Sequence, residues 1–463
     1  MRLSLPLALL FGLTFMLVQS SSNAQTGTLP SAPVQNATSP VGADSSSQTP
    51  PVVGGKGPQI NLTLSDAEAR ALKNEPHLLA EEFRTQAANK RVTESRAGYF
   101  PQLSANLTAI DTNGDSAVAA GALTTSSISA RAAGGASLVQ MITDFGHTPN
   151  LVQSSRLQAS AAGQDQESIR QSILMEVREA YFAAQAAESV RKTAQAVLDF
   201  RKVTLRQLTA LAQSQLRSTL DVQFAQVMTS EAEIAVVRAE SNEEKAQAQL
   251  AASMGEEGNT VYALTDEPLP ASPDADPGGY INQAIANRPD LKAFQLRSES
   301  ATHEAKAERD LNFPTVNALA TGGEVPVHDP TLHHDYGAVG LNINIPVFNG
   351  GLYTARAAEA KLQARAADQD ASLRKVEIVR DVRMTWADAR DAYLQIDVTQ
   401  RLLDQANVAM RLAQARYDAG LGSIVELNQA ELNRTSVLIT AASARFDYQR
   451  SMTAFQFALG DLH

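Results

Sequence analysis

The chain of 463 residues contains no cysteine and has no long hydrophobic segment beyond its N-terminus. The lack of cysteine excludes disulfides, thiol catalysis and cysteine metal sites, and it also excludes an N-terminal lipid anchor, which is attached to a cysteine. No stretch after the N-terminus approaches 18 uninterrupted apolar residues, so we expect no transmembrane helix in the mature chain. If the chain enters a membrane, it must do so with strands.

Aromatic residues and positive charge are also scarce. The formal net charge of −11 argues against binding to a phosphate backbone, so we expect no nucleic-acid partner. With 5% aromatic residues, 44% apolar residues and abundant alanine, the composition favours stacked helices over an enzyme with a dense core. No nucleophile elbow, phosphate loop or metal-ligand motif is present, and we expect neither enzymatic activity nor a cofactor.

The N-terminus has the pattern of a secretory signal peptide over residues 1–24. Arg2 precedes an apolar run from Leu5 to Val18, and Ser22-Asn23-Ala24 fits a cleavage site. The run of about fourteen residues is too short to span about 30 Å of hydrocarbon. Residues 25–58 are rich in Ser, Thr, Pro and Gly, which predicts a flexible leader.

The rest of the chain is duplicated. Ala71–Leu78 recurs as Ala284–Leu291, and Tyr99-Phe100-Pro101 recurs as Asn312-Phe313-Pro314, both displaced by 213 residues. Duplication on this scale means that each copy is one architectural unit. The predicted boundaries are 59–267 for the first repeat and 277–463 for the second.

Each repeat opens with a helix and continues with two strands. Ser65 followed by Glu68 is a capping-box pattern that predicts a helix to about Gly98, and the second copy is expected from about Gly279 to Asn312. Prolines 101 and 314 then end the helical geometry. Apolar and small or polar residues alternate afterwards, which predicts a two-stranded hairpin in each repeat. The four expected strands are 103–109, 133–142, 315–321 and 339–347, the first two joined by a longer Ser/Thr/Ala/Gly loop.

Long helical rods follow the strands. The expected rods are 149–213 and 352–419, each about 100 Å long at about 1.5 Å per residue. In the second rod, apolar residues recur at a seven-residue spacing, which predicts a left-handed supercoil against a neighbour. These residues are Val382, Ala389, Ile396, Leu403, Met410 and Tyr417. A returning helix ends near Gly460, and two short helices stacked end to end could lie beside each rod.

The strands have the length and alternation of membrane-crossing strands, about nine to eleven residues each. Four strands cannot close a barrel, and open edges are not tolerated in hydrocarbon, so several chains would have to contribute to one barrel. The alternative is that the hairpins are soluble caps on a helical bundle.

Several short segments, in this order and in duplicate, resemble those of the TolC-type outer-membrane efflux protein family. They are Pro101, Pro314, Pro346–Gly351, Ala415–Gly420 and Ala458–Gly460, within a match from about Leu62 to Leu459. The resemblance implies a mainly α fold with membrane β strands, and a homotrimer with a twelve-stranded barrel in the outer-membrane lipid. It also implies a long helical barrel across the periplasm, and partnership with a periplasmic adaptor and an inner-membrane pump.

We therefore expect the exit duct of a tripartite efflux pump, passing small molecules such as drugs or metals. One alternative is the outer-membrane duct of a type I protein secretion system. The other is a non-conducting periplasmic coiled-coil scaffold or adaptor.

The resemblance also assigns candidate residues at the end of the rods. Family members are gated by acidic residues after the tip turn of the second repeat, where this chain has Glu426 and, one turn later, Gln429. Asp221 is the counterpart of Glu426 in the first repeat. Three copies of Glu426 facing each other would favour cations.

Adaptors dock on exposed helical turns in this family. Ala419-Gly420-Leu421 fits that pattern in the second repeat, and in the first repeat Leu216 remains although the glycine is lost. A final cluster, His328, His333 and His334 with Asp329 and Asp335, lies in an expected outer loop. We read it as polar surface and expect no metal site.

Overall fold

A computed structural model of the chain describes residues 60–110, 116–120, 123–128, 131–257, 260–327 and 333–462. The signal peptide and leader predicted for residues 1–58 lie outside these ranges. The first half of the described chain contains β1 (Ile60–Leu62), α1 (Leu64–Asn74), α2 (Pro76–Arg96), β2 (Gln102–Ile110), β3 (Ser116–Ala120), β4 (Leu123–Ile128), β5 (Arg131–Thr143), α3 (His147–Gln213), α4 (Thr219–Ser253) and β6 (Tyr262–Leu264). The second half contains α5 (Gly278–Asn287), α6 (Pro289–Asp310), β7 (Thr315–Val327), β8 (Asp335–Asn344), α7 (Leu352–Asp418) and α8 (Ile424–Leu459).

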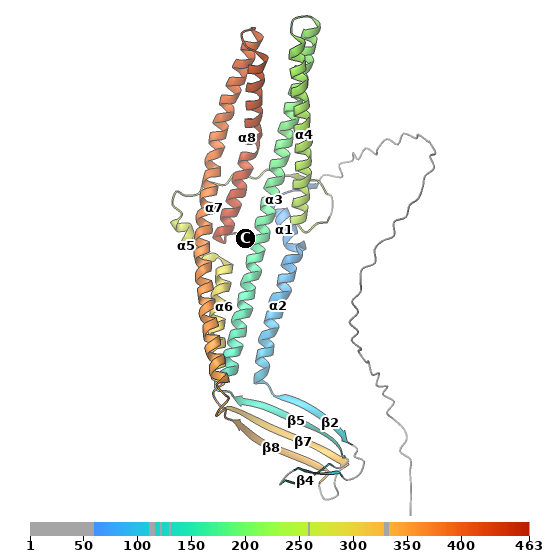
Figure 1. Ribbon diagram of the computed structural model, residues 1–463, viewed down its shortest axis with the longest axis vertical. Helices are drawn as coiled ribbons and strands as arrows, with labels where there is room; N and C mark the ends of the chain where they lie inside the picture. Colours follow the sequence, from blue (N-terminus) through green and yellow to red (C-terminus); the bar gives the residue numbers. More distant parts are fainter. Residues whose placement is uncertain are drawn as a thin grey trace, which may run out of the picture. The chain divides into compact units, whose positions relative to one another are not determined.

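One order of elements occurs twice along the chain. Two short helices are followed by two long strands, a rod and a returning helix, first as α1, α2, β2, β5, α3 and α4, then as α5, α6, β7, β8, α7 and α8 (Figure 1). The rods α3 and α7 have 67 residues each, in agreement with the expected length of about 65 residues. The returning helices have 35 and 36 residues.

The four long strands form one antiparallel sheet in the order β2-β5-β7-β8. Its register places apolar side chains in rows across the strands, because Leu103 is opposite Leu138, and Ala320 is opposite both Leu138 and Val339. The expected strand over 339–347 is shifted, since β8 begins at Asp335 and ends at Asn344. Pro346 cannot donate to the ladder, which explains the earlier end.

Two further strand pairs were not expected from the sequence. The loop predicted between the first two strands contains β3 and β4, which pair antiparallel with each other. Its Ser, Thr and Ala residues show no clear alternation of apolar and polar positions, so the pattern that identified the other strands was absent. The second pair, β1 with β6, is parallel and only three residues long, and its partners are about 200 residues apart.

The expected first helix is wrong in two respects. Its N-cap is Thr63, two residues before the predicted Ser65, and the Thr63 Oγ1 accepts a hydrogen bond from the Asp66 N–H (3.2 Å). The helix is also interrupted at Glu75, because Pro76 lacks an amide hydrogen and disfavours helical geometry before it. The second repeat has the same interruption at Arg288, before Pro289.

Each returning helix ends against the interruption of its own repeat. Gly255 adopts φ +68°, and a Cβ there would lie 2.9 Å from the Asn74 carbonyl oxygen. Gly460 adopts φ +71°, and a Cβ there would lie 3.1 Å from the Arg288 Cα. Only glycine combines this backbone conformation with such a close approach at low cost. The end-to-end stacking of short helices expected from their lengths is therefore confirmed.

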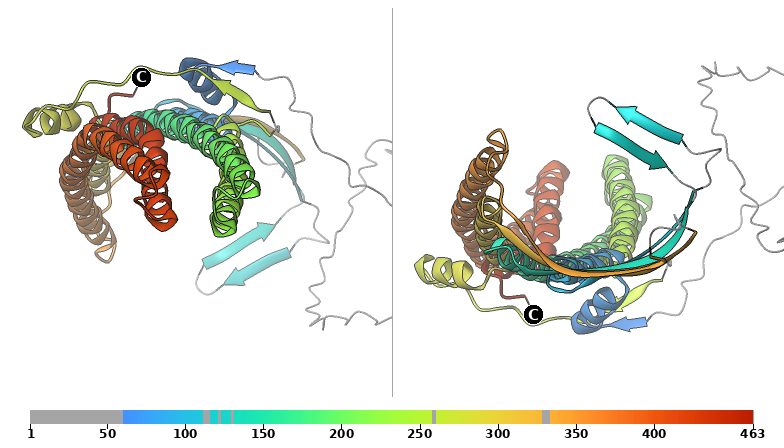
Figure 2. Two further views of the ribbon diagram at one scale, coloured as in Figure 1. Left: turned by 90° about the horizontal axis from the view of Figure 1, so that it is seen from above. Right: turned by 90° about the horizontal axis from the view of Figure 1, so that it is seen from below.

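The helices form a curved layer. Near the sheet, α3 contacts α2 and α6, and α6 contacts α7; farther away, α3 contacts α4 and α8, and α8 contacts α7. Figure 2 shows α1, α5 and the C-terminus on the convex side of this layer. The seven-residue repeat in α7 lies at the packed surfaces, since its six members are all buried or half-buried. A buried stripe with this spacing is the pattern expected of a helix that supercoils against its neighbours.

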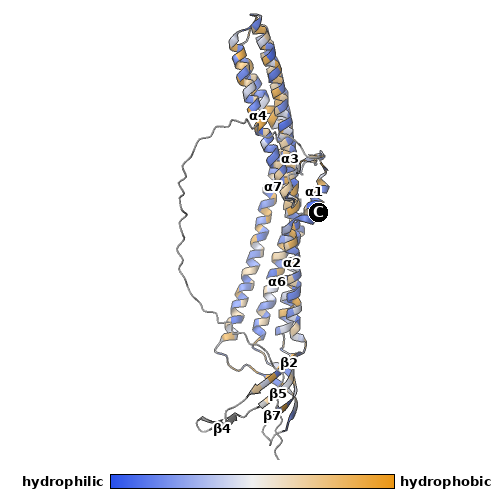
Figure 3. Ribbon diagram, turned by 90° about the vertical axis from the view of Figure 1, so that its right-hand side faces the viewer, coloured by the Kyte–Doolittle hydropathy of each residue, from blue (hydrophilic) through white to orange (hydrophobic). Residues whose placement is uncertain are grey.

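The hydrophobic core is divided into separate clusters along the helices. The largest is at mid-length, where Tyr181 is completely buried and packs with Val177, Leu250 and Met254. Figure 3 shows polar and apolar residues intermixed along the long helices labelled there, such as α3, α4 and α7. Among the described residues, none of the helices combines the length and the apolar character needed to cross a membrane.

Candidate functional site

The candidate residues lie at the two helical turns farthest from the sheet, which we call the tips. The first tip connects α3 to α4 and the second connects α7 to α8. In the second tip, the Gly420 N–H donates to the Tyr417 carbonyl (3.0 Å) and the Leu421 N–H donates to the Arg416 carbonyl (2.8 Å). These two bonds define a Schellman motif, which satisfies the last carbonyls of α7.

The first tip has the same conformation without a glycine. Gln215 adopts φ +60°, close to the +71° of Gly420, and its N–H donates to the Ala212 carbonyl (2.9 Å). The Leu216 N–H completes the motif by bonding the Leu211 carbonyl (2.9 Å). Leu216 and Leu421 therefore occupy equivalent positions, with 70% and 75% of their surface exposed. Loss of the glycine has not changed the backbone conformation of the turn.

The two tips are joined by Tyr417, which is buried in the last turn of α7. Its hydroxyl donates to the Asp221 Oδ2 in the first turn of α4 (2.7 Å). Arg217 of the first tip lies over the Tyr417 ring, 4.2 Å from its centroid, and donates to the Tyr417 carbonyl (3.2 Å). Burial is the main reason why the pKa of Tyr417 is raised to about 12, and the hydrogen bond to Asp221 and the negative charge of Asp221 raise it further. The phenol is therefore a permanent donor near neutral pH.

Glu426 and Gln429 lie in the first two turns of α8, directly after the second tip, and both are exposed. Glu426 forms an ion pair with Arg416 of α7 (3.3 Å), and its N–H donates to the capping Ser423 Oγ (3.1 Å). The Gln429 amide donates to the Asn433 Oδ1 (3.1 Å). Both side chains line one groove between α7 and α8. The structure thus groups Glu426 with Gln429 and separates both from Asp221, which is engaged by Tyr417.

A buried ion pair between the two halves of the molecule was missed by the sequence analysis. Arg201 of α3 donates to Glu431 of α8, and each side chain is more than nine-tenths buried. Burial lowers the pKa of Arg201 and raises the pKa of Glu431, against the mutual attraction of the two charges. The nearby Arg434 instead donates to the Asn407 Oδ1 (2.7 Å). No local pattern marks Arg201 or Glu431 among the many charged residues of these helices.

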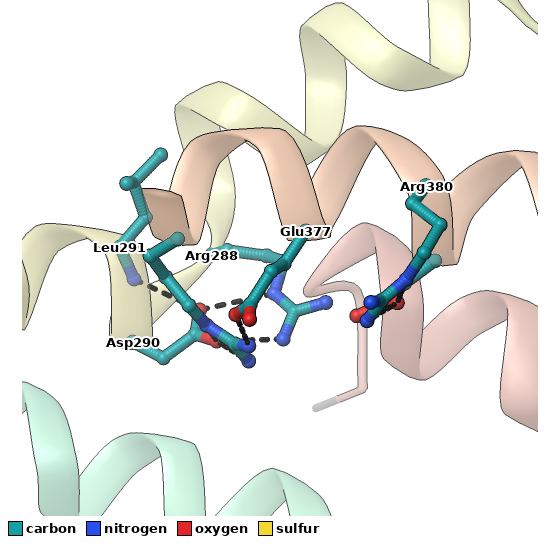
Figure 4. A network of polar contacts seen from close by, with 7 residues as sticks. Arg288, Asp290, Leu291, Glu377 and Arg380 are labelled. Carbon is teal, nitrogen blue, oxygen red and sulfur yellow. Dashed lines mark hydrogen bonds and ion pairs between the residues drawn. The ribbon is translucent and has the colours of Figure 1, made fainter. Parts of the chain in front are cut away.

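A second polar network lies at the helix interruption of the second repeat (Figure 4). The Asp290 carboxylate accepts hydrogen bonds from Arg288 (2.6 Å) and from Arg374 of α7 (2.5 Å), and Arg374 also donates to Glu377 (2.8 Å). Burial alone would raise the pKa of Asp290, but the bonds and charges of the two arginines lower it below its usual value. This network clamps α6 to α7 through a fully ionised carboxylate.

The histidine cluster contributes no site in the described residues. His328 and Asp329 lie outside them, and within them no group of three or more His, Cys, Asp or Glu side chains is arranged to hold a metal ion.

Comparisons with known proteins agree with this architecture. A family of proteins described as "Outer membrane efflux protein" matches the chain twice, at residues 69–256 and 280–461. Protein CyaE of Bordetella pertussis is 25% identical over 386 residues, which cover 80% of this chain and 78% of that protein. Outer membrane protein TolC of Escherichia coli is 23% identical over 429 residues, covering 87% and 84%.

Solved structures show the same fold. The outer membrane protein VceC of Vibrio cholerae superposes with a TM-score of 0.74 at 20% identity, covering 86% of this chain and 96% of that one. Because the family match extends over most of the chain and includes both repeats of elements, the chain belongs to the outer membrane efflux proteins.

Proposed function

We propose that three copies of this outer membrane efflux protein form one duct that conducts small molecules out of the cell. The observation that carries the proposal is the open sheet. In the described residues, β2 and β8 each have a strand partner on one side only. An unpaired strand edge costs several kcal/mol for each unsatisfied group in lipid. Joining β2 of one copy to β8 of the next removes every edge and gives a closed barrel of twelve strands.

The side chains of the sheet support contact with lipid on one face. Leu103 and Leu107 of β2 and Val339 and Leu341 of β8 have between 72% and 90% of their surface exposed. The opposite face carries small or polar residues such as Ser104 and Asn342. Apolar residues facing lipid and polar residues facing a water-filled interior are the arrangement of membrane barrels. In a non-conducting scaffold the apolar face of the sheet would be exposed to water, which is unfavourable in free energy.

Aromatic residues mark the level at which the helices meet the sheet. An exposed phenylalanine lies at each of the four crossings between a helix and a long strand. These residues are Phe100, Phe145, Phe313 and Phe348. Aromatic side chains prefer the interface between membrane and water, so this girdle supports a barrel that ends there and helices that continue into the periplasm.

The tips are then the entrance of the duct. In our proposal Leu216 and the Ala419-Gly420-Leu421 turn dock a periplasmic adaptor, which connects the duct to an inner-membrane pump. Exposed leucines on rigid turns support this role, because their burial in a partner is favourable. The Tyr417–Asp221 contact holds the two tips of one chain together, and Glu426 with Gln429 supplies the polar lining that selects cations.

The absence of cysteine allows the shared barrel to be tested by cross-linking. Ser104→Cys on β2 is combined in turn with Ala338→Cys, Gly340→Cys or Asn342→Cys on β8. In one chain β2 and β8 are separated by two strands, or about 14 Å, which is too far for a disulfide. We expect a covalent trimer for one of the three registers after mild oxidation of outer membranes.

Two controls complete the experiment. Ser104→Cys alone, and Ser104→Cys with Ser214→Cys at the tip, should remain monomeric on a denaturing gel. If protein recovered from outer membranes forms no cross-link in any register, the shared barrel is wrong.

A further inference from the structure

A basic groove runs between α6 and α7, close to the sheet and separate from the tips. It encloses about 890 Å³ and is lined by Lys306 and Arg309 of α6 and by Lys361 and Arg365 of α7. Asp368 is its only acidic lining residue. The remaining walls are small or neutral and include several alanines. The groove therefore carries an excess of three positive charges in a chain whose net charge is −11.

Most of these positive charges are not neutralised within the chain. Among the described residues, Lys306, Lys361 and Arg365 form no ion pair. Arg309 bonds the buried Asp310 through Nε (2.9 Å) and Nη2 (2.7 Å), but its side chain remains 61% exposed. Three of the four cations are thus available to an external anion, and Arg309 retains unused donors.

Helix periodicity places the groove on the convex side of the helical layer. The hydroxyl of Tyr181 in α3 donates to the Leu62 carbonyl in β1, which lies on the convex side with α1. Asp165 precedes Tyr181 by sixteen residues, or about four and a half helical turns. Asp165 therefore faces the opposite, concave side. Asp165 pairs with Arg297 of α6. Lys306 follows Arg297 by nine residues, about two and a half turns, and therefore faces the convex side.

The α7 wall leads to the same result. Ala364 of the groove precedes Ile378 by fourteen residues, which is two heptads, so both lie on one stripe of the supercoiled helix. Ile378 packs in a cluster with Ala284 of α5, and α5 is on the convex side (Figure 2). Both walls come from one chain, since α6 lies between α3 and α7. The groove is therefore not an edge that a neighbouring copy must cover.

The position of the groove along the helices is defined by the aromatic girdle. Arg309 is four residues before Phe313, and Lys361 is thirteen residues after Phe348. At about 1.5 Å per helical residue, the basic residues lie about 5 to 25 Å from the girdle along the helices, with Arg365 the farthest. Long lysine and arginine side chains readily extend to headgroups at this depth. Anionic membrane surfaces attract such cations.

We propose that the α6–α7 groove binds the phosphate of an anionic phospholipid in the periplasmic leaflet of the outer membrane. The positive charge matches the phosphate, the alanines leave room for the headgroup, and the convex face and the girdle place the groove where lipid is present. The inference rests on the proposed membrane position of the sheet. The same chemistry would accept free phosphate, and the experiment separates these two sources.

The test uses native mass spectrometry of the full-length protein released from detergent. Phosphatidylglycerol or phosphatidylcholine is added at equal concentration, and bound lipids are counted per chain. We expect at least a tenfold preference for phosphatidylglycerol. The variant Lys306→Gln/Lys361→Gln/Arg365→Gln should lose this preference. The matched variant Arg206→Gln/Arg238→Gln/Lys245→Gln removes three exposed cations far from the sheet and should keep it.

Each outcome decides the proposal. Equal binding of both lipids, or an undiminished preference in the groove variant, would overturn it. Displacement of the bound lipid by millimolar inorganic phosphate, together with phosphate adducts in the absence of lipid, would show a free-phosphate site instead. Trimer assembly of the groove variant, measured by the β2–β8 cross-link, separates the two hypotheses. A groove variant that forms the trimer and has lost the lipid preference supports the groove. A native protein that forms the trimer but shows no lipid preference contradicts only the groove, whereas failure of the cross-link in the native protein contradicts the proposed function.

Discussion

The hydroxyl of Tyr417, in the last turn of α7, donates a hydrogen bond of 2.7 Å to the carboxylate of Asp221, in the first turn of α4. These residues are 196 positions apart, and they connect the two tips of one chain. A hydrogen bond to a charged group contributes about 1.5 to 3 kcal/mol. We therefore expect Tyr417→Phe, which keeps the ring and removes the donor, to let the tips separate.

Spin labels at Ser214→Cys and Leu421→Cys would report that separation as a longer and broader distance distribution in Tyr417→Phe. Tyr393→Phe is the matched control, because Tyr393 packs edge-to-face on Tyr448 at mid-length and does not reach the tips. An unchanged distribution in Tyr417→Phe would show that the hydrogen bond does not hold the tips together.

The Arg201–Glu431 pair predicts an asymmetry between single and double substitutions. Glu431→Gln leaves the buried Arg201 charge without a partner and should destabilise the folded chain by about 3 to 5 kcal/mol. The double variant Arg201→Met/Glu431→Leu removes both charges and should recover most of that loss. Thermal unfolding followed by helical circular dichroism measures both effects. A double variant as unstable as Glu431→Gln would contradict this account.

The Asp290 clamp predicts a dependence of stability on acid pH. Because the folded-state pKa of Asp290 lies below its usual value of 3.8, its ionised form is favoured in the folded chain. The resulting stability is fully present above the unfolded pKa and is lost as the pH falls through the folded pKa. Asp290→Asn should therefore be less stable than the native chain by a constant amount above about pH 5, and the difference should shrink below pH 4. Denaturant unfolding at a series of pH values measures the difference in free energy of unfolding between the native chain and Asp290→Asn. A difference that stays constant down to the lowest pH would show that the clamp does not act by charge.

The proposed gate can be tested in both directions at neighbouring positions. Three copies of Glu426 around one axis attract cations, so Glu426→Ala should weaken the block of single-channel current by multivalent cations added from the periplasmic side. Gln429→Asp adds a second acidic ring and should strengthen the block. Glu240→Ala removes a charge from the exposed surface of α4 and serves as control. Equal block in all these variants would remove Glu426 and Gln429 from the conduction pathway.

The lipid-facing side of the sheet is tested by charge substitution on its two faces. Leu341→Arg should cost about 2 to 4 kcal/mol per chain if the side chain is at the middle of the bilayer, and recovery of trimer in the outer membrane should fall accordingly. Asn342→Arg places the same charge on the opposite face and should assemble. Normal assembly of Leu341→Arg would contradict the assigned orientation of β8.

Much of the fold follows from local patterns in the sequence. The strands were recognised by alternation and the helices by composition. Both rods and the returning helix of the second repeat were predicted within about three residues. The interruptions at Pro76 and Pro289 could also have been found, because the prolines were present in the duplicated segment. Each proline lies within an otherwise continuous helical pattern, which hides the interruption.

The candidate site was predictable only in part. Glu426 and Gln429 are exposed on α8, where the position after the tip turn placed them. The equivalence of the tips was not predictable, because Gln215 adopts a left-handed conformation that its residue type does not indicate. The surrounding Schellman hydrogen bonds overcome that preference.

The sequence by itself determined the two repeats, the type of nearly every long element and the alternation of the strands. These properties depend on residues that are neighbours along the chain. Only the tertiary structure decided that Tyr417 meets Asp221 and that Arg201 meets Glu431 across 230 positions. It also decided that, within the described part of the chain, β2 and β8 are the two open edges of the four-stranded sheet. Such contacts depend on how supercoiled helices and twisted strands pack, so charged residues that look alike in the sequence have different partners and burial in the folded chain.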